Sequence, residues 1–480
     1  MKKKLAVTLA VLFVLAVSFA MVPKKANAIP AFAQKYHFSC AVCHTVFPNL
    51  NPFGRAFWRN GFRLPGTNGT PSDATQITQG LSLPNPWPIP VMIEPIISYQ
   101  HYTNENVNPQ TDAFKAEADL VSAGAFKVYT PFANSVSFYV HFNSSSPKQV
   151  LEQKQIFASI NGLGAGFGVP SHLFNLKLGQ VTTASPYFYR QMPFYILGGP
   201  AGNGQGLAVG YDGENGNLIH ARNEGFALYG TPGYHLWYKV TVTNDAGSPN
   251  KLNGTQAYNA EALPGGTISN AMEYSYQLKE YYPVPMGQLE FGYYGATVAE
   301  PISTVATGDE AWTNRVTING VDVDLANDIY ELGLTYMVQS DNHPYGNPSI
   351  PSNNISVDNS VVGNTNSSNG YSEFEIYGRY LFPQIGNGLM LVGDYAQYSW
   401  THKNLQEGWI NGNPTTCENA SLYQSGTYTS SNGCTNEGIK DAIALQAEYN
   451  LAYNAHLYLA YLFTNKSQDD TLGTGLDFAF

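Results

Sequence analysis

Charged residues are scarce in this chain: Lys, Arg, Asp and Glu make up only 12% of its 480 residues, whereas soluble proteins average roughly 25%. Basic residues are the scarcer kind, with 24 Lys and Arg against 35 Asp and Glu, so the net charge is −11. Nucleic-acid binding needs a basic surface to neutralise phosphates, so this balance argues against a nucleic-acid partner. Heptad repeats are also missing, and the 33 Tyr and 25 Phe exclude collagen-like, coiled-coil and disordered classes.

Long apolar runs are scarce too, and the one that exists lies at the N-terminus. Residues 1–28 begin with three lysines after Met1, continue with an apolar stretch over 5–22 and end with the A-x-A triplet Ala26-Asn27-Ala28. This pattern is typical of a secretory signal peptide; the alternative is an uncleaved membrane anchor. No later segment reaches the roughly 18 apolar residues that a spanning helix needs, so any later passage through a membrane must use β-strands.

The next segment, residues 29–66, is short and basic, and we call it the head. Its charged residues are Lys35, Arg55, Arg59 and Arg63, with no acid among them. Within it, Asn51-Pro52 predicts a short helix, with Asn as the N-cap, Pro at the first helical position and Gly61 near the end. A proline-rich linker over 67–89 follows and is expected to be stiff.

From residue 90 to residue 480 the hydrophobic pattern has a period of two, which indicates β-strands. In 329–338, for example, tyrosine and aliphatic residues alternate with Glu331, Gly333 and Thr335. We expect 16 such strands, centred near residues 97, 121, 138, 157, 177, 224, 238, 275, 294, 317, 334, 377, 395, 443, 460 and 475. A β-sandwich would show the same period.

The connections between these segments favour a barrel over a sandwich. Tight turns, such as those near 230–233 and 383–388, alternate with long polar loops, such as those near 183–217 and 403–437. Short turns on one side and long loops on the other are typical of outer-membrane barrels, and the terminal Phe480 is typical of bacterial outer-membrane proteins. The predicted fold is all-β: a 16-stranded antiparallel barrel over 90–480, in contact with outer-membrane lipid and wide enough for an aqueous lumen. We expect the outer membrane of a Gram-negative-type bacterium.

Cysteine is rare, and the four cysteines form two pairs. The first pair lies in Cys40-Ala41-Val42-Cys43-His44, a C-x-x-C-H motif that predicts covalent attachment of one haem c. The two thiols would add across the haem vinyl groups, and His44 is placed to be the proximal iron ligand. A coincidental match and a redox disulfide are the alternatives.

The second pair, Cys417 and Cys434, lies in one long loop with 16 residues between the two cysteines. A local disulfide is the expected arrangement, and closing a loop of this size stabilises a protein by roughly 3 kcal/mol. It indicates a braced extracytoplasmic loop rather than catalysis, because disulfides persist in exported compartments.

The sequence does not single out the second protein ligand of the haem iron, on the side away from His44. Candidates are Met92, Met192, His37, His101 and His141. His37 lies too close to the attachment site, His101 shares the face expected to meet lipid, and His141 lies at the far end of its strand. Met92 is preferred because it falls on the lumen face at the near end of the first strand. Each candidate could instead serve packing alone, and an open or water-bound position is also compatible with the sequence.

The head resembles a known family. The resemblance is carried by Ile29-Pro-Ala-Phe-Ala-Gln-Lys-Tyr, the C-x-x-C-H motif, Phe47-Pro48-x-Leu50-x-Pro52-Phe53-Gly54-Arg55-x-Phe57 and Asn60-Gly61-Phe62. These stretches are similar to the fused monohaem cytochrome c–porin family, which includes outer-membrane iron oxidases of iron-oxidising bacteria. The resemblance implies a mostly helical cytochrome head on a 16-stranded porin, with Cys40, Cys43 and His44 as its haem residues.

This resemblance implies electron transfer from extracellular Fe(II) through the haem to a periplasmic carrier, such as a soluble cytochrome. A solute porin with a structural or sensory haem and a conduit that exports electrons remain alternatives. The head is too small to bury much core alone, and its four basic residues complement acids expected in the lumen. Those acids are Glu94, Glu290, Glu331, Glu373, Glu375 and Glu448. We therefore expect the head to plug the periplasmic mouth, although ordinary lumen polarity would also explain the acids.

Overall fold

The computed structural model describes the barrel strands and most of the head. The described residues are Phe32, Tyr36, 38–46, 49–64, 75–78, 81–83, 91–102, 112–128, 130–145, 151–182, 222–244, 272–303, 310–341, 369–400, 409–410, 413–414, 441–452, 455–464 and 471–478. The predicted signal peptide, Cys417, Cys434, His37 and Met192 lie outside them. No helix in the described ranges combines the length and apolarity of a membrane-spanning helix.

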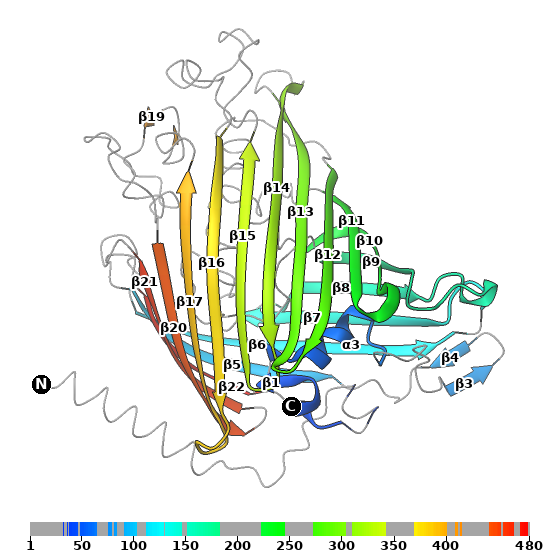
Figure 1. Cartoon of the computed structure of the whole chain (residues 1–480), viewed down its shortest axis with the longest axis horizontal. Coiled ribbons are helices and arrows are strands. Elements are labelled where there is room, and N and C mark those ends of the chain that lie inside the picture. The colour runs from blue at the N-terminus through cyan, green and yellow to red at the C-terminus, as the bar shows by residue number, and fades with distance from the viewer. Residues whose placement is uncertain are drawn as a thin grey trace, which may run out of the picture.

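Sixteen antiparallel strands pair in sequence order and close into a barrel, because the last strand bonds to the first (Figure 1). They are β5 (Met92–Tyr102), β6 (Asp112–Lys127), β7 (Ser135–Ser145), β8 (Leu151–Asn161), β9 (Asn175–Thr182), β10 (Arg222–Gly230), β11 (Leu236–Asn244), β12 (Met272–Val284), β13 (Gly287–Ser303), β14 (Glu310–Ala326), β15 (Tyr330–Asp341), β16 (Asn369–Phe382), β17 (Leu389–Trp400), β20 (Asp441–Ala452), β21 (Ala455–Thr464) and β22 (Thr471–Phe478). Each predicted strand centre falls within one of them, so the predicted barrel is confirmed.

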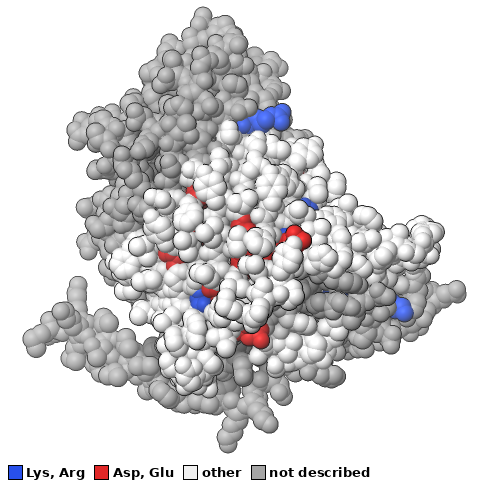
Figure 2. Space-filling view, viewed as in Figure 1, with Lys and Arg blue, Asp and Glu red and all other residues white. Residues whose placement is uncertain are grey.

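The alternation of side chains gives the barrel two different walls. On β13, Phe291 and Tyr293 are each 46% exposed on the outside, whereas Glu290 and Tyr294 are 3% and 0% exposed on the lumen side. The described residues on the face in Figure 2 are mostly uncharged. A closed barrel leaves no strand edge unpaired in lipid, and an apolar outer wall around a polar lumen belongs to an outer-membrane barrel. The chain is therefore an outer-membrane protein.

The two ends of the barrel differ in their connections, as predicted. At one end the links are short: β12 ends at Val284 and β13 begins at Gly287, and β14 ends at Ala326 and β15 begins at Tyr330. The links at the other end include the long segments between β9 and β10, between β15 and β16, and between β17 and β20. Short turns face the periplasm in barrels of this type.

The described head is compact and only partly helical. It consists of a 3-10 turn η1 (Cys40–Val42), the paired strands β1 (His44–Val46) and β2 (Asn49–Leu50), and helix α3 (Pro52–Arg59). Two further short pairs are β3 (Thr75–Thr78) with β4 (Leu81–Leu83), and β18 (Trp409–Ile410) with β19 (Asn413–Pro414). The predicted helix is confirmed, since the Asn51 side chain accepts a hydrogen bond from Gly54 N at 2.9 Å. The described residues do not, however, show a mostly helical head, because the β-branched Thr45 and Val46 favour a strand.

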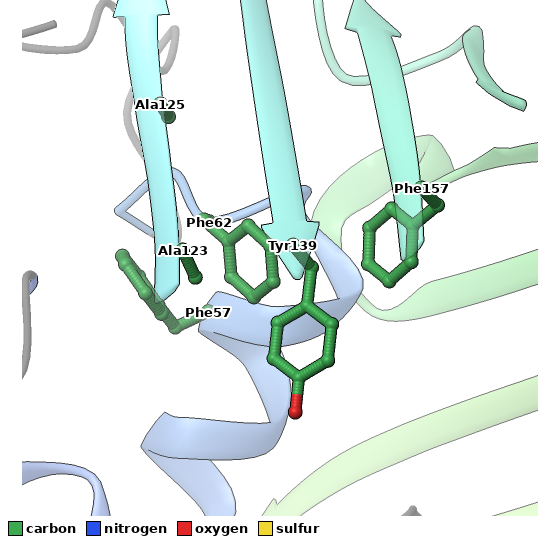
Figure 3. Packing of buried hydrophobic residues seen from close by; sticks show 6 residues of the cluster. All are labelled: Phe57, Phe62, Ala123, Ala125, Tyr139 and Phe157. Atoms are coloured by element: carbon green, nitrogen blue, oxygen red, sulfur yellow. The ribbon is translucent and has the colours of Figure 1, made fainter. Parts of the chain in front are cut away.

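Helix α3 packs its aromatic side chains against the inner wall of the barrel. Phe57 and Phe62 are 5% and 3% exposed. Figure 3 shows them facing the strands that carry the rest of this core, namely Ala123 and Ala125 of β6, Tyr139 of β7 and Phe157 of β8. Phe62 stacks on Phe157 with ring centroids 6.3 Å apart. The head aromatics thus obtain from the barrel the cover that a short segment cannot supply itself.

Candidate functional site at the C-x-x-C-H turn

The C-x-x-C-H residues form one tight turn next to α3. Cys43 N donates to Cys40 O at 3.1 Å, and His44 opens β1, where it pairs with Leu50. Cys40 and Cys43 are both free and half-buried. Two free thiols and an imidazole within five consecutive residues are the donor set that covalent haem attachment needs.

Burial changes the acidity of both thiols. It raises the pKa of Cys43 to about 11, with the neighbouring Cys40 adding to the effect, and it also raises the pKa of Cys40. Redox-active cysteines in C-x-x-C motifs need the opposite, a lowered pKa that favours the thiolate. The turn therefore does not have the electrostatics of a disulfide oxidoreductase, which argues against the redox alternative.

The turn and α3 are bound together as one unit. Asn51 N donates to Cys43 O at 2.9 Å, and the Asn51 amide donates to Val42 O at 3.1 Å and to Ala41 O at 3.3 Å. Gly54 lies so close that a Cβ at this position would be 2.1 Å from Cys43 O. Any group attached to the turn is therefore held at a fixed place relative to α3.

Arg59 ties α3 to the barrel through a buried ion pair. Its Nη1 and Nη2 donate to the two carboxylate oxygens of Glu290 at 2.6 and 2.7 Å, a bidentate geometry. The guanidinium also lies 5.4 Å from the ring centre of Trp237 and 5.3 Å from that of Tyr281. Bidentate pairs add geometric specificity as well as energy, so this contact fixes the rotation of the helix.

Arg55, one turn earlier, joins the head to a second group of barrel residues. Its guanidinium pairs with Glu331 and with Asp324, the latter at 3.3 Å. Arg379 of β16 also pairs with Glu331 and donates to Leu50 O at 3.2 Å. Burial alone would lower the pKa of Arg55, but Glu331 and Asp324 outweigh it and raise the pKa, so the side chain stays charged.

Arg63 anchors the end of the head by a different kind of contact. It donates to the carbonyl oxygens of Asn60 at 2.8 Å and Ser171 at 3.0 Å, and to Asn175 Oδ1 at 2.8 Å. Ser171 and Asn175 lie at the short-turn end of the barrel, where β9 begins. The three head arginines thus bind three separate places on the inner wall.

The predicted lumen acids all lie on the inner face, each 3% exposed or less. Glu290 and Glu331 bind head arginines, which confirms the expected charge complementarity for two of the six. The sequence prediction did not name Asp324 or Arg379 as partners of the head. The alternation along β14 and β16 nevertheless places them on the same wall as Asp322 and Tyr377.

The other predicted ligands are more dispersed. Met92 is 7% exposed on the lumen face of β5 and packs against Val121, which also touches the Phe57 core. His141 is 2% exposed, with Nε2 3.0 Å from Asp119 Oδ2. The assignment of Met92 as an iron ligand stays a prediction, as does the Cys417–Cys434 disulfide, which lies outside the described residues.

The sequence prediction also missed His456, a histidine of β21 that lies on the lumen wall and is 0% exposed. Its Nδ1 lies 2.8 Å from Asn450 Oδ1 and 3.4 Å from Glu448 Oε1. The imidazole of His44 is close enough to act on it electrostatically. The available signal was its parity with Tyr458 together with its place at the short-turn end of a strand.

The comparisons with known proteins concern the barrel. No protein-family profile matches the chain, and no curated protein matches it. Among solved structures, it is similar to OmpF of Salmonella typhi in complex with daunomycin, with a TM-score of 0.46, 13% identity and coverage of 82% of this chain and 97% of that one. It is also similar to a loop L8 deletion mutant of OmpT, an outer-membrane protein of Vibrio cholerae, with a TM-score of 0.45, 10% identity and coverage of 82% and 99%. A mutant of the Rh. blastica porin gives a TM-score of 0.41, 10% identity and coverage of 82% and 100%.

Proposed function

We propose that this chain is an outer-membrane c-type cytochrome that carries electrons from extracellular Fe(II) through one haem c to a periplasmic acceptor. The observation that carries the proposal is the C-x-x-C-H turn, whose free thiols and imidazole belong to a unit fixed to the barrel wall by Arg55, Arg59 and Arg63. The resemblance of residues 29–62 to fused cytochrome c–porins supports it. In this proposal the head plugs the periplasmic mouth of the lumen.

Each residue of the turn has a definite task in this proposal. Cys40 and Cys43 would hold a haem as thioethers, and His44 would be a ligand of its iron. A bound haem c supplies one-electron transfer between its ferrous and ferric states. Asn51 and Gly54 keep the turn against α3, so that the attached group has one position relative to the barrel.

The lumen above the head suits a cationic substrate. Glu373 and Glu375 of β16 and Asp394 of β17 are buried on the lumen wall, farther from the short turns than Arg379. Buried carboxylates on a wall of low dielectric give the lumen a negative potential, which attracts cations. Fe(II) entering from the long-loop side would therefore be drawn along this wall towards the head.

Haem staining followed by Fe(II) titration tests the proposal. Full-length protein is expected to keep haem stain after denaturing electrophoresis, and the double variant Cys40→Ala/Cys43→Ala is expected to lose it. Adding Fe(II) to the oxidised protein is expected to give the same reduced-minus-oxidised spectrum as a strong chemical reductant. Stain that persists in the double variant would overturn covalent attachment at this turn.

The same titration separates the alternatives. A haem that a strong reductant reduces but Fe(II) does not would favour a solute porin with a structural or sensory haem. A haem potential too low for Fe(II) to reduce, combined with rapid oxidation by external acceptors, would favour a conduit that exports electrons. In the proposed function, single-channel conductance of the full chain is small and rises when residues 29–66 are deleted.

A further inference from the structure

The head makes different kinds of contact with different strands around the inside of the barrel. The aromatic side chains of α3 and the loop after it meet β6, β7 and β8, and the arginines Arg59 and Arg55 meet β13, β14 and β15. Arg379 then binds Leu50, the residue that pairs with His44, from β16. Continuing round the barrel in strand order, β17 and β20 lead to β21, which carries His456 at its short-turn end.

His456 lies where the C-x-x-C-H turn can meet it. It is the second residue of β21, at the same end of the barrel as the head contacts, and it is 0% exposed on the lumen wall. The imidazole of His44 is close enough to act electrostatically on it. The lumen wall within electrostatic range of His44 therefore carries a second imidazole.

The hydrogen bonding of His456 prepares one ring nitrogen for a metal. Its Nδ1 is 2.8 Å from Asn450 Oδ1, an atom that only accepts hydrogen bonds. Nδ1 must then carry the hydrogen, so the lone pair of the neutral ring lies on Nε2. Metal-bound histidines almost always donate their other ring N–H to an oxygen in this way. Glu448 Oε1, 3.4 Å from Nδ1, supports the same orientation.

The site is also rigid, and its rivals are less suited. Asn450 and His456 are cross-strand partners in the hairpin of β20 and β21, and residues on strands hold ligand geometry better than residues on loops. In His141, by contrast, the nitrogen beside the acid is Nε2, 3.0 Å from Asp119 Oδ2, which leaves only the more crowded Nδ1 for a metal. The Met92 side chain is packed against Val121, so packing alone accounts for its position.

We propose that His456 would be a second protein ligand of the iron in a haem attached at Cys40, Cys43 and His44, an inference that rests on the proposed function. Asn450 and Glu448 are then positioning residues, which fix the ring and keep the hydrogen on Nδ1. Because His456 belongs to the barrel and the attachment site to the head, these residues would join the two parts of the molecule through a bound haem.

The experiment uses the full-length holoprotein, with absorption and electron paramagnetic resonance spectra as readouts besides activity. Wild type is expected to give a low-spin ferric haem with two imidazole ligands. His456→Ala is expected to keep haem stain, become high-spin and bind carbon monoxide readily when reduced. Added imidazole is expected to restore the low-spin spectrum, and His456→Met is expected to stay low-spin with a higher reduction potential. Met92→Ala and His141→Ala are the matched controls and are expected to resemble wild type.

A low-spin spectrum of unchanged type in His456→Ala would overturn the proposal, and so would a high-spin wild type. A change of spin state in Met92→Ala alone would assign the ligand to Met92 instead. The heat-dependent electrophoretic shift of folded barrels shows whether each variant is folded, and imidazole rescue separates ligand loss from misfolding. Absence of haem stain in wild type would instead be a failure of the proposed function, which keeps the two outcomes apart.

Discussion

Each strand of the barrel is hydrogen-bonded along its length to two neighbours, whereas the head meets the barrel through a small number of side chains. The closed ladder repeats the same backbone contact sixteen times, so a single side chain contributes little to its existence. The head depends on one aromatic cluster and on buried charge pairs centred on Glu290 and Glu331. Substitutions at the contact are therefore expected to release the head while the barrel stays folded.

Glu331 is the position where this difference is expected to be largest. It pairs with both Arg55 and Arg379, and its carboxylate is 0% exposed. Glu331→Gln keeps the shape but leaves two buried guanidinium groups with less compensation; losing one partner of a buried pair typically costs about 3–5 kcal/mol. We expect the head of the full-length variant to become sensitive to limited proteolysis, while the heat-dependent electrophoretic shift of the barrel is unchanged.

The isosteric control for this variant is Glu224→Gln, which removes an exposed glutamate from β10. It is expected to leave both the head and the barrel as in wild type, because its side chain lies on the outer face of β10, away from the head. A head in Glu331→Gln that resists protease as well as the control does would show that the aromatic cluster alone holds it.

Gly54 tests the link between the helix and the C-x-x-C-H turn. A Cβ here would lie 2.1 Å from the backbone oxygen of Cys43 and 2.9 Å from Leu50 Cδ2. Backbone atoms shift less readily than the end of a flexible side chain. Gly54→Ala is therefore expected to destabilise the folded head by about 1–3 kcal/mol, as overpacking does. Haem stain per molecule is expected to fall, because the turn no longer rests on α3.

A glycine of the barrel provides the matched comparison. At Gly378, on β16, the nearest atoms to an added Cβ are 3.7 Å away, which is an ordinary contact. Gly378→Ala is therefore expected to leave stain and barrel stability unchanged. Equal behaviour of the two alanine variants would contradict the close contact between α3 and the turn.

The fold was predictable because most barrel strands follow the same alternating pattern. Residues such as Leu332 and Leu334 must face lipid and Glu331 must face the lumen, so a period of two appears in the sequence wherever a strand crosses the membrane. The ends of strands followed from turn composition. The number of strands was predictable because each membrane crossing has its own alternating segment in the sequence, wherever its neighbours lie.

For the contacts between head and barrel, the sequence predicted only which kinds of residue would meet, not which individual residues. Basic residues in the head and acids in the lumen implied an attraction, but which arginine meets which acid depends on register and on contacts such as Arg59 with Glu290, separated by 231 positions. His456 could not be singled out for the same reason. The alternation of residues along its strand predicted that it faces the lumen, but its approach to His44 depends on how the barrel closes. Local rules did predict the helix, since the Asn51 cap acts within four residues.

Asn51 has two separable roles in the head, and its variants are expected to have smaller effects than those at Glu331 and Gly54. Its Oδ1 caps α3 at Gly54 N, and its Nδ2 donates to the turn at Ala41 O and Val42 O. Asn51→Ala removes both and is expected to weaken the head by about 1 kcal/mol through the cap, with a further loss from the turn. Asn51→Asp keeps the cap, so protease resistance is expected to lie between wild type and Asn51→Ala. An Asp variant as weak as the Ala variant would place the whole effect in the contacts to the turn.

The smallest expected effect is a pH dependence confined to the head of haem-free protein. Burial raises the pKa of Cys43 to about 11 from an ordinary value of 9.0, so the folded head holds this proton more tightly than the unfolded chain does. The resulting stabilisation is fully present below pH 9 and is lost as the pH rises through 9 towards 11. Because only the thiolate is alkylated, modification of Cys43, followed at the peptide level, is expected to be slow at neutral pH, with its midpoint near 11 in folded protein and near 9 after denaturation. A midpoint at or below 9 in the folded protein would mean that the thiol is not buried against the head, and it would restore the redox alternative.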